Sequence, residues 1–197
     1  MTRFFATTFR GVEDISAEEI VATTGATIDD APYRRVQFTL QANFGSLLRL
    51  RTVDDLFVTI GHWQGVTRQR SSLDLIAEKA GAMPLDAVLP VIGEVRALPA
   101  TPLFSVTASH VGKRNYSSDE IKQHVADALT ASRPWQYTQN DADADLNVRL
   151  FIEGEGVDVG ARLAKGPLYK RDYAVADYPG SLKPPLAAAL IRIAAPR

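Results

Sequence analysis

Basic residues beside a predicted helix start are the part of this sequence best suited to bind a ligand. Lys113 and Arg114 lie in a short segment that is followed directly by Ser117-Ser-Asp-Glu120. A serine with a glutamate three residues later is a capping box, which predicts a helix from Ser117 to about Ala131. Lys and Arg side chains bind phosphate, and so do the backbone N–H groups of a helix start. The predicted phosphate contacts are Lys113, Arg114, Ser117 and Ser118. The alternative is that Ser117 and Glu120 only cap the helix.

The charge of the chain is unevenly distributed. Residues 1–159 contain 15 Lys/Arg and 21 Asp/Glu, whereas residues 160–197 contain 7 Lys/Arg and 2 Asp/Glu. This local excess of positive charge favours an anionic partner, although a solvated basic face gives the same pattern. Tyr116 and Tyr169 either stack on an unpaired base or pack in the core. Further predicted anion contacts are Arg68, Arg70, Arg162, Lys165, Lys170 and Arg171.

No set of residues in the sequence forms a recognisable catalytic or metal centre. There is no cysteine, which excludes disulfides, thiolate zinc sites and cysteine nucleophiles. The three histidines lack metal-ligand spacing, and no Gly-rich phosphate loop is present. The run from Asp141 to Asp145 resembles the start of a calcium loop, but Leu146 and Ile152 stand where glycine and glutamate are required. We therefore expect no catalytic residue, no metal and no cofactor site within this chain.

Composition is that of a soluble globular protein. The chain has 197 residues, is 46% hydrophobic and has an isoelectric point near 6.3. No apolar stretch approaches the roughly 20 residues that a membrane span needs, and the first residues lack the apolar core of a secretory signal. We expect a cytoplasmic protein without membrane contact.

The first third of the chain predicts a ferredoxin-like order of strands and helices. Strands are expected at residues 3–8, 26–28, 35–40 and 56–60, and helices at 12–21 and 44–50, with Gly25 ending the first helix and Asn43 capping the second. This strand-helix-strand-strand-helix-strand order predicts a compact α+β unit.

The rest of the chain predicts a second α/β unit followed by a linker. Helices are expected at residues 73–80, 85–96 and 117–131, and strands at 103–109, 146–152 and 157–162. A hairpin turn is expected at 153–156, a short strand at 168–170, and an apolar helix at 186–195 after the Pro/Gly-marked segment. Trp63 and Trp135 are assigned to packing.

Four stretches, in this order, resemble parts of one enzyme family. Residues 104–121 and 145–173 resemble the THUMP domain of RNA-modifying enzymes. Residues 6–20 resemble the ferredoxin-like module that precedes THUMP in tRNA guanine-N2 methyltransferases. Residues 179–189 resemble the entry helix of the Rossmann-type methyltransferase domain in the same enzymes. The resemblance implies a ferredoxin-like domain at 1–66, a THUMP domain at 67–172, and a linker with entry helix at 173–197.

This resemblance carries further expectations about function. It implies that the chain binds the acceptor end of tRNA and positions it for guanine-N2 methylation by a C-terminal domain. That domain would use S-adenosylmethionine, and its Gly-rich loop and Asn/Asp-Pro-Pro-aromatic motif are not in this sequence. The sequence departs from the family pattern at Ala174, a position that is often basic in the family.

Two other interpretations remain open from the sequence. The chain could be a stand-alone THUMP adaptor that presents tRNA to a separate methyltransferase, or a protein-interaction domain that binds no RNA. The apolar segment 186–195 bears on the first alternative, because it would pack on a catalytic domain in a fused enzyme. The basic C-terminal segment disfavours the second.

Overall fold

The computed structural model describes residues 1–171, 173, 178 and 180–194. Ala174 and much of the predicted linker therefore lie outside the described residues. The chain forms two compact units, one from residues 1–58 and 166–197 and the other from residues 59–165. The units do not follow chain order, because the C-terminal segment belongs with the N-terminal residues. Strand β4 (Asp55–Trp63) contributes residues to both units.

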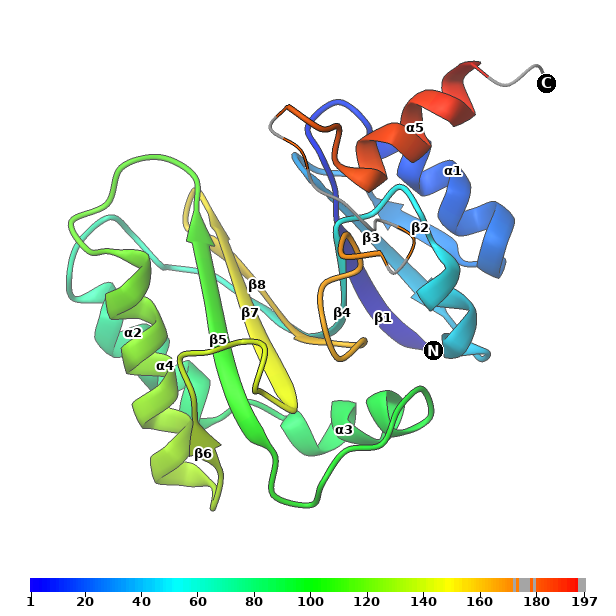
Figure 1. The fold of residues 1–197 in the computed structure, drawn as a ribbon. Coiled ribbons are helices and arrows are strands. Elements are labelled where there is room, and N and C mark those ends of the chain that lie inside the picture. Colours follow the sequence, from blue (N-terminus) through cyan, green and yellow to red (C-terminus); the bar gives the residue numbers. More distant parts are fainter. Residues whose placement is uncertain (172, 174–177, 179, 195–197) are drawn as a thin grey trace. The chain divides into compact units, whose positions relative to one another are not determined.

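The first unit is built on a four-stranded antiparallel sheet (Figure 1). Its strand order is β2-β3-β1-β4, and β1 pairs with both β3 and β4. This is the ferredoxin-like arrangement that the order of elements predicts. The strands other than β4 are β1 (Thr2–Thr7), β2 (Thr27–Asp30) and β3 (Arg35–Leu40).

Aromatic side chains form the core of this first sheet. Phe4 stacks on Phe38 with 5.6 Å between ring centroids, and Phe5 stacks on Phe57 at 5.0 Å. All four rings are buried. Offset or tilted aromatic pairs of this kind stabilise a core beyond the area that they bury. The pairs join neighbouring strands, so they also fix the register of the sheet.

Three helical segments lie among the described residues of the first unit. Helix α1 (Glu13–Thr24) ends at Gly25, whose φ of +70° is the left-handed conformation that a helix end favours. The connection from β3 to β4 contains a short 3-10 helix, η1 (Phe44–Arg49). Asn43 holds the predicted N-cap position, with a φ of +62°, but its side chain makes no capping hydrogen bond. Helix α5 (Pro184–Ala194) packs against α1.

The second unit contains a sheet with the strand order β4-β8-β7-β5-β6. Strands β5 and β7 are parallel, whereas β7 and β8 form an antiparallel hairpin. The hairpin turn starts at Gly154, whose φ of +59° suits the tight two-residue turns that match strand twist. The strands are β5 (Leu103–His110), β6 (Gln136–Tyr137), β7 (Leu146–Glu153) and β8 (Gly156–Arg162).

Three helices complete the second unit. Helix α4 packs on β5, and α2 packs beside α4, so both helices lie on the same side of the sheet (Figure 1). Helix α4 is amphipathic, with Ile121, Val125 and Leu129 buried at helical spacing. Trp135 is 6% exposed and contacts Phe104, in agreement with its assignment to packing. The helices are α2 (Ser72–Gly81), α3 (Leu85–Gly93) and α4 (Ser118–Ser132).

Several elements differ from the sequence prediction: α3 ends at Gly93 instead of residue 96, and β4 extends to Trp63 instead of residue 60. Residues 168–170 form a turn rather than a strand, with the N–H of Lys170 donating to the carbonyl of Pro167 at 3.1 Å. The two-residue strand β6 was not predicted, because two residues are too few to show alternation. Within the described residues, none of the helices has both the length and the hydropathy to cross a membrane.

Candidate nucleic-acid interface

The start of α4 has the capping box that the sequence predicts. The Ser117 hydroxyl accepts a hydrogen bond from the Glu120 N–H at 3.2 Å, and the Ser117 N–H donates to Glu120 Oε2 at 2.8 Å. Hydrogen bonds from Ser117 and from the Arg70 side chain lower the pKa of Glu120 to about 2. The carboxylate therefore occupies part of the space that an anion would need at this helix start. Capping alone accounts for both residues.

Arg114 is engaged in contacts that hold its own loop. One guanidinium nitrogen donates to the carbonyls of Val66 and Thr67, at 3.0 and 2.8 Å, and to the Tyr116 hydroxyl at 3.0 Å. The other nitrogen donates to the Gly154 carbonyl at 2.5 Å. Arg114 therefore ties the segment before α2 and the β7–β8 turn to the loop before α4. This role needs the forked guanidinium, which presents several donors in a fixed plane.

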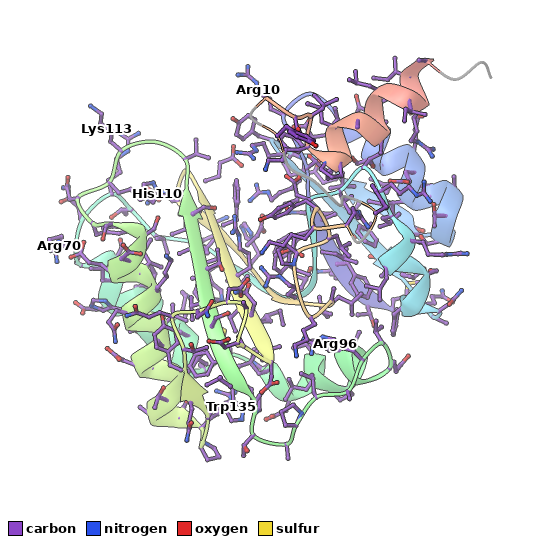
Figure 2. The ribbon with its side chains drawn as sticks, viewed as in Figure 1. Arg10, Arg70, Arg96, His110, Lys113 and Trp135 are labelled. Carbon is purple, nitrogen blue, oxygen red and sulfur yellow. The ribbon has the colours of Figure 1, made fainter. Side chains whose placement is uncertain are left out.

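Lys113, Arg68 and Arg70 are the predicted cations that remain exposed at this end of the second unit. Figure 2 shows Lys113 and Arg70 projecting outward from loops at the end of the unit opposite to Trp135. The Arg70 side chain is 62% exposed although it pairs with Glu120 and donates to the Asn115 carbonyl. The Asn115 N–H donates to the Arg68 carbonyl at 3.0 Å, which brings the two loops together. Arg68, Arg70 and Lys113 thus form an exposed cationic loop cluster.

The two predicted contacts after β8 differ in their surroundings. Arg162 is 5% exposed, and its guanidinium donates to Asp141 Oδ2 at 2.6 Å. Burial opposes ionisation of Asp141, but hydrogen bonds from Ser105 and the charge of Arg162 lower its pKa. Lys165 is exposed. Of these two residues, only Lys165 presents its charge to solvent.

Lys170 and Arg171 belong to the first unit. Lys170 is exposed, whereas Arg171 is half-buried and donates to the Leu50 carbonyl at 2.6 Å. Burial lowers the pKa of Arg171. Arg171 therefore anchors the C-terminal segment to the residues that precede β4, and Lys170 is the accessible member of the pair.

The two tyrosines considered for base stacking are placed differently. Tyr116 is 4% exposed, and its hydroxyl donates to the Thr67 carbonyl at 2.7 Å, so the stacking hypothesis is wrong for this ring. Tyr169 is half-buried, and the ammonium of Lys183 lies 5.9 Å from its ring centroid. Ser118 is half-buried and lies in the first turn of α4.

The carboxylates of the acidic run 141–145 have hydrogen-bond partners within the second unit. Asp141 accepts from Ser105 and Asn147 at 2.7 Å each, and Asp145 accepts from the Leu103 N–H at 3.0 Å. Across the part of the chain that the structure describes, His, Asp and Glu residues form no group of three or more that could hold a metal ion. The carboxylates therefore fasten the loop before β7 to the start of β5.

Sequence reasoning missed a group of basic and aromatic residues in the first unit. Arg10 lies over the ring of Tyr33, with its Cζ atom 6.0 Å from the ring centroid. Arg34, the next residue, has a φ of +58° and is exposed. The pair Tyr33-Arg34 after a proline was an available signal, because it places an aromatic and a basic side chain in one turn.

Comparison with known proteins gives solved structures with the same fold. No family model matches the sequence, and no curated protein matches it. The structure is similar to TrmN from Thermus thermophilus, with a TM-score of 0.73 and 26% identity over 98% of this chain and 55% of that one. It is also similar to a predicted N6-adenine-specific DNA methylase from Listeria monocytogenes, with a TM-score of 0.73 and 20% identity over 98% and 48% of the two chains.

A third similar structure was solved with RNA. It is a 4-thiouridine synthetase–RNA complex with bound ATP, with a TM-score of 0.51 and 14% identity over 82% of this chain and 41% of that one. TrmN and the predicted methylase match this chain over nearly its whole length. The chain itself spans only about half the length of each of these two proteins. At these identities, the likeness to the methylase and the synthetase establishes a shared α+β fold.

Proposed function

We propose that this chain is the tRNA-binding part of an S-adenosylmethionine-dependent RNA methyltransferase. In this proposal, residues 1–66 form the ferredoxin-like domain, 67–172 the THUMP domain and 173–197 the linker with the entry helix. The chain binds the acceptor end of tRNA and positions it for guanine-N2 methylation by a C-terminal domain. In this proposal, S-adenosylmethionine is the cofactor of that C-terminal domain.

The observation that carries the proposal is the similarity to TrmN along 98% of the chain. It agrees with the order of the four sequence stretches that resemble the tRNA methyltransferases. The RNA-bound 4-thiouridine synthetase, which has the same fold over 82% of this chain, supports RNA as the ligand. The name of the Listeria monocytogenes protein suggests DNA instead, so the test below includes a DNA arm.

The cationic loop cluster is the proposed contact surface in the second unit. Lys113 makes no hydrogen bond to any described residue, and Arg68 and Arg70 are exposed. Helical RNA is recognised mainly by its shape, phosphates and 2′-hydroxyls, and exposed Lys and Arg in loops suit that recognition. Lys165 in this unit and Lys170 in the first unit are further proposed phosphate contacts. Arg114 holds the loop that carries Lys113, and Arg162 is engaged with Asp141, so neither arginine is a proposed contact.

A stand-alone adaptor is the second candidate, and helix α5 is the observation that bears on it. Leu190, Ile191 and Ile193 on this helix are exposed by 49%, 69% and 60%. Apolar side chains gathered on one helix are commonly covered by another protein surface. A catalytic domain of the same protein could cover these side chains, and so could a separate enzyme. The helix therefore supports a protein contact under both candidate functions.

A binding titration tests the proposed function. The chain is titrated against tRNA with and without its 3′-terminal CCA, and against duplex DNA of similar length, at about 50 and about 200 mM salt. We expect the tightest binding to intact tRNA, with affinity falling as salt rises because phosphate contacts release counterions. Equal binding to tRNA and DNA would contradict acceptor-end recognition, and no binding to tRNA at the lower salt would contradict the proposal itself.

Paired substitutions locate the contact. Lys113→Ala with Arg68→Ala should weaken tRNA binding and lower the salt slope, whereas Lys79→Ala on α2 should leave both unchanged. Wild-type affinity in the double variant would exclude the cationic loop cluster as the contact surface.

A further inference from the structure

The first unit carries a cationic and aromatic cluster of its own, made of Arg10, Tyr33 and Arg34. Arg10 and Arg34 are exposed, and Tyr33 is 43% exposed. Arg10 lies over the Tyr33 ring at 6.0 Å. Figure 2 shows Arg10 projecting outward from the end of the first unit. An exposed aromatic ring with one guanidinium group over it, and a second arginine at the next position in the chain, offers apolar and charged contacts together.

Glu13 fixes the two turns that carry these residues. Its Oε2 accepts from the Gly11 N–H at 2.7 Å, and its Oε1 accepts from the Arg34 N–H at 2.8 Å. Burial opposes the ionised form, but these backbone N–H groups, together with the charge of Arg10, lower the pKa of Glu13. The Thr8 N–H also donates to the Arg34 carbonyl at 2.9 Å. The turn after β1 and the turn before β3 are thus held together before any ligand arrives, which reduces the entropy lost on binding.

The guanidinium groups themselves keep most of their donors free. The Nε of Arg34 lies 3.4 Å from the Thr8 carbonyl, and its two terminal nitrogens donate to none of the described residues. Arg10 contacts the Tyr33 ring and makes no hydrogen bond or ion pair within the described part of the chain. Guanidinium forks with free donors bind phosphate oxygens in pairs. The available donors therefore match an anionic group next to the ring.

A second cation–aromatic pair lies in the same unit, next to Asp54. The Tyr169 N–H donates to the Asp54 carbonyl at 2.8 Å, and Lys183 lies over the Tyr169 ring at 5.9 Å. The charge of Arg34 acts on the Asp54 carboxyl and opposes the rise in pKa that burial causes.

We propose that Arg10, Tyr33 and Arg34 form a binding site for an unpaired nucleotide of the RNA, with the base on the Tyr33 ring and its phosphate on the guanidinium groups. Aromatic rings with basic neighbours bind single strands in this way, because every base presents a flat face to the ring. An acidic protein segment would use the guanidinium groups but would gain nothing specific from the ring. This nucleotide site rests on the proposed function in one respect, which is that the nucleic acid is RNA.

The test uses the full chain and a short single-stranded RNA that contains one 2-aminopurine. Arg10→Ala with Arg34→Ala should weaken binding about tenfold and reduce the salt slope by about 1.4, the loss expected for two phosphate contacts on a single strand. Tyr33→Ala should abolish the stacking-induced change in 2-aminopurine fluorescence, and Tyr33→Phe should retain it. Arg49→Ala, an exposed cation of the same unit, is the matched control and should leave affinity and slope unchanged.

The outcomes separate this site from the proposed function. If the folded Arg10, Arg34 and Tyr33 variants keep the affinity, the salt slope and the fluorescence change of the wild type, the site is overturned. This holds even if the cationic loop cluster binds tRNA. Loss of the short-RNA signal in these variants would support the site, even if intact tRNA fails to bind the chain. Circular dichroism melts establish that each variant is folded. A wild-type chain that gives no signal with the short RNA also overturns the site.

Discussion

Arg162 and Asp141 form an ion pair in which the arginine is almost completely buried. The guanidinium nitrogen lies 2.6 Å from Asp141 Oδ2, and the exposed fractions of the two side chains are 6% and 37%. Asp141 also accepts from Ser105 and Asn147, so the pair closes a polar network that joins β5, β7 and β8. The pair is therefore a structural element of the second unit.

Arg162→Ala should destabilise the second unit without acting on RNA directly. The substitution leaves the Asp141 carboxylate partly buried and unpaired, which should lower the free energy of unfolding by about 2–3 kcal/mol. Urea unfolding of the variant and wild type measures this change. Lys165→Ala, an exposed cation three residues later, should change stability by less than about 0.5 kcal/mol. Equal stability of Arg162→Ala and wild type would contradict a structural role.

Arg114→Ala should likewise lower stability, because one side chain serves four acceptors. Removal leaves the carbonyls of Val66, Thr67 and Gly154 without this donor, at an expected cost of about 2 kcal/mol. Arg114→Lys should recover only a small part of the loss, because an ammonium cannot span these positions. Lys113→Ala next to it should leave the unfolding midpoint unchanged. If Arg114→Lys is as stable as wild type, the forked geometry is not what the loop requires.

Ser117→Ala should weaken the start of α4. Loss of the capping hydroxyl should reduce the free energy of unfolding by about 1 kcal/mol. The partner carboxylate of Glu120 has a pKa lowered in the folded state to about 2 by hydrogen bonds from Ser117 and Arg70. Its contribution is present above the unfolded pKa near 4.5 and is lost as the pH falls toward 2. Ser117→Ala should therefore make unfolding less dependent on pH in that acidic range, as denaturant titrations at several pH values would reveal.

Local patterns predicted most of the fold. The alternation of Val36, Phe38 and Leu40 predicted β3 with its observed bounds, because one face of that strand is buried. The capping box at Ser117 and the left-handed end at Gly25 are also set by neighbouring residues. These features depend on contacts within about four residues, which a single sequence records directly.

The roles of individual basic residues could not be read in the same way. Arg114 and Arg162 look alike in sequence to Lys113 and Lys165, yet the arginines are engaged and the lysines are exposed. Their partners are distant in the chain, for example Thr67 for Arg114 and Asp141 for Arg162. Charge and spacing predict a basic surface, but only tertiary contacts decide which side chains remain available to a ligand.

Asp54 provides a prediction with an unusual direction of pH dependence. Burial raises its pKa from 3.8 to about 6, Arg34 opposes this shift and Asp55 adds to it. Because the folded pKa is the higher one, the folded state favours the neutral carboxyl. Its stabilising contribution is complete below the unfolded pKa of 3.8 and is lost as the pH rises through about 6.

Asp54→Asn should therefore stabilise the first unit near neutral pH and have little effect near pH 4. The amide keeps the shape of the neutral carboxyl, and both backbone bonds of residue 54, from its N–H to Thr7 and from Tyr169 to its carbonyl, remain. We expect a gain of about 1–2 kcal/mol at about pH 7.5, less than the full shift implies because solvent screens a partly exposed group. Urea unfolding at about pH 4, 6 and 7.5 measures the difference, with the exposed Asp14→Asn as a control that should stay flat. A gain that is the same at all three pH values would mean that packing, and not the charge of Asp54, sets its effect on stability.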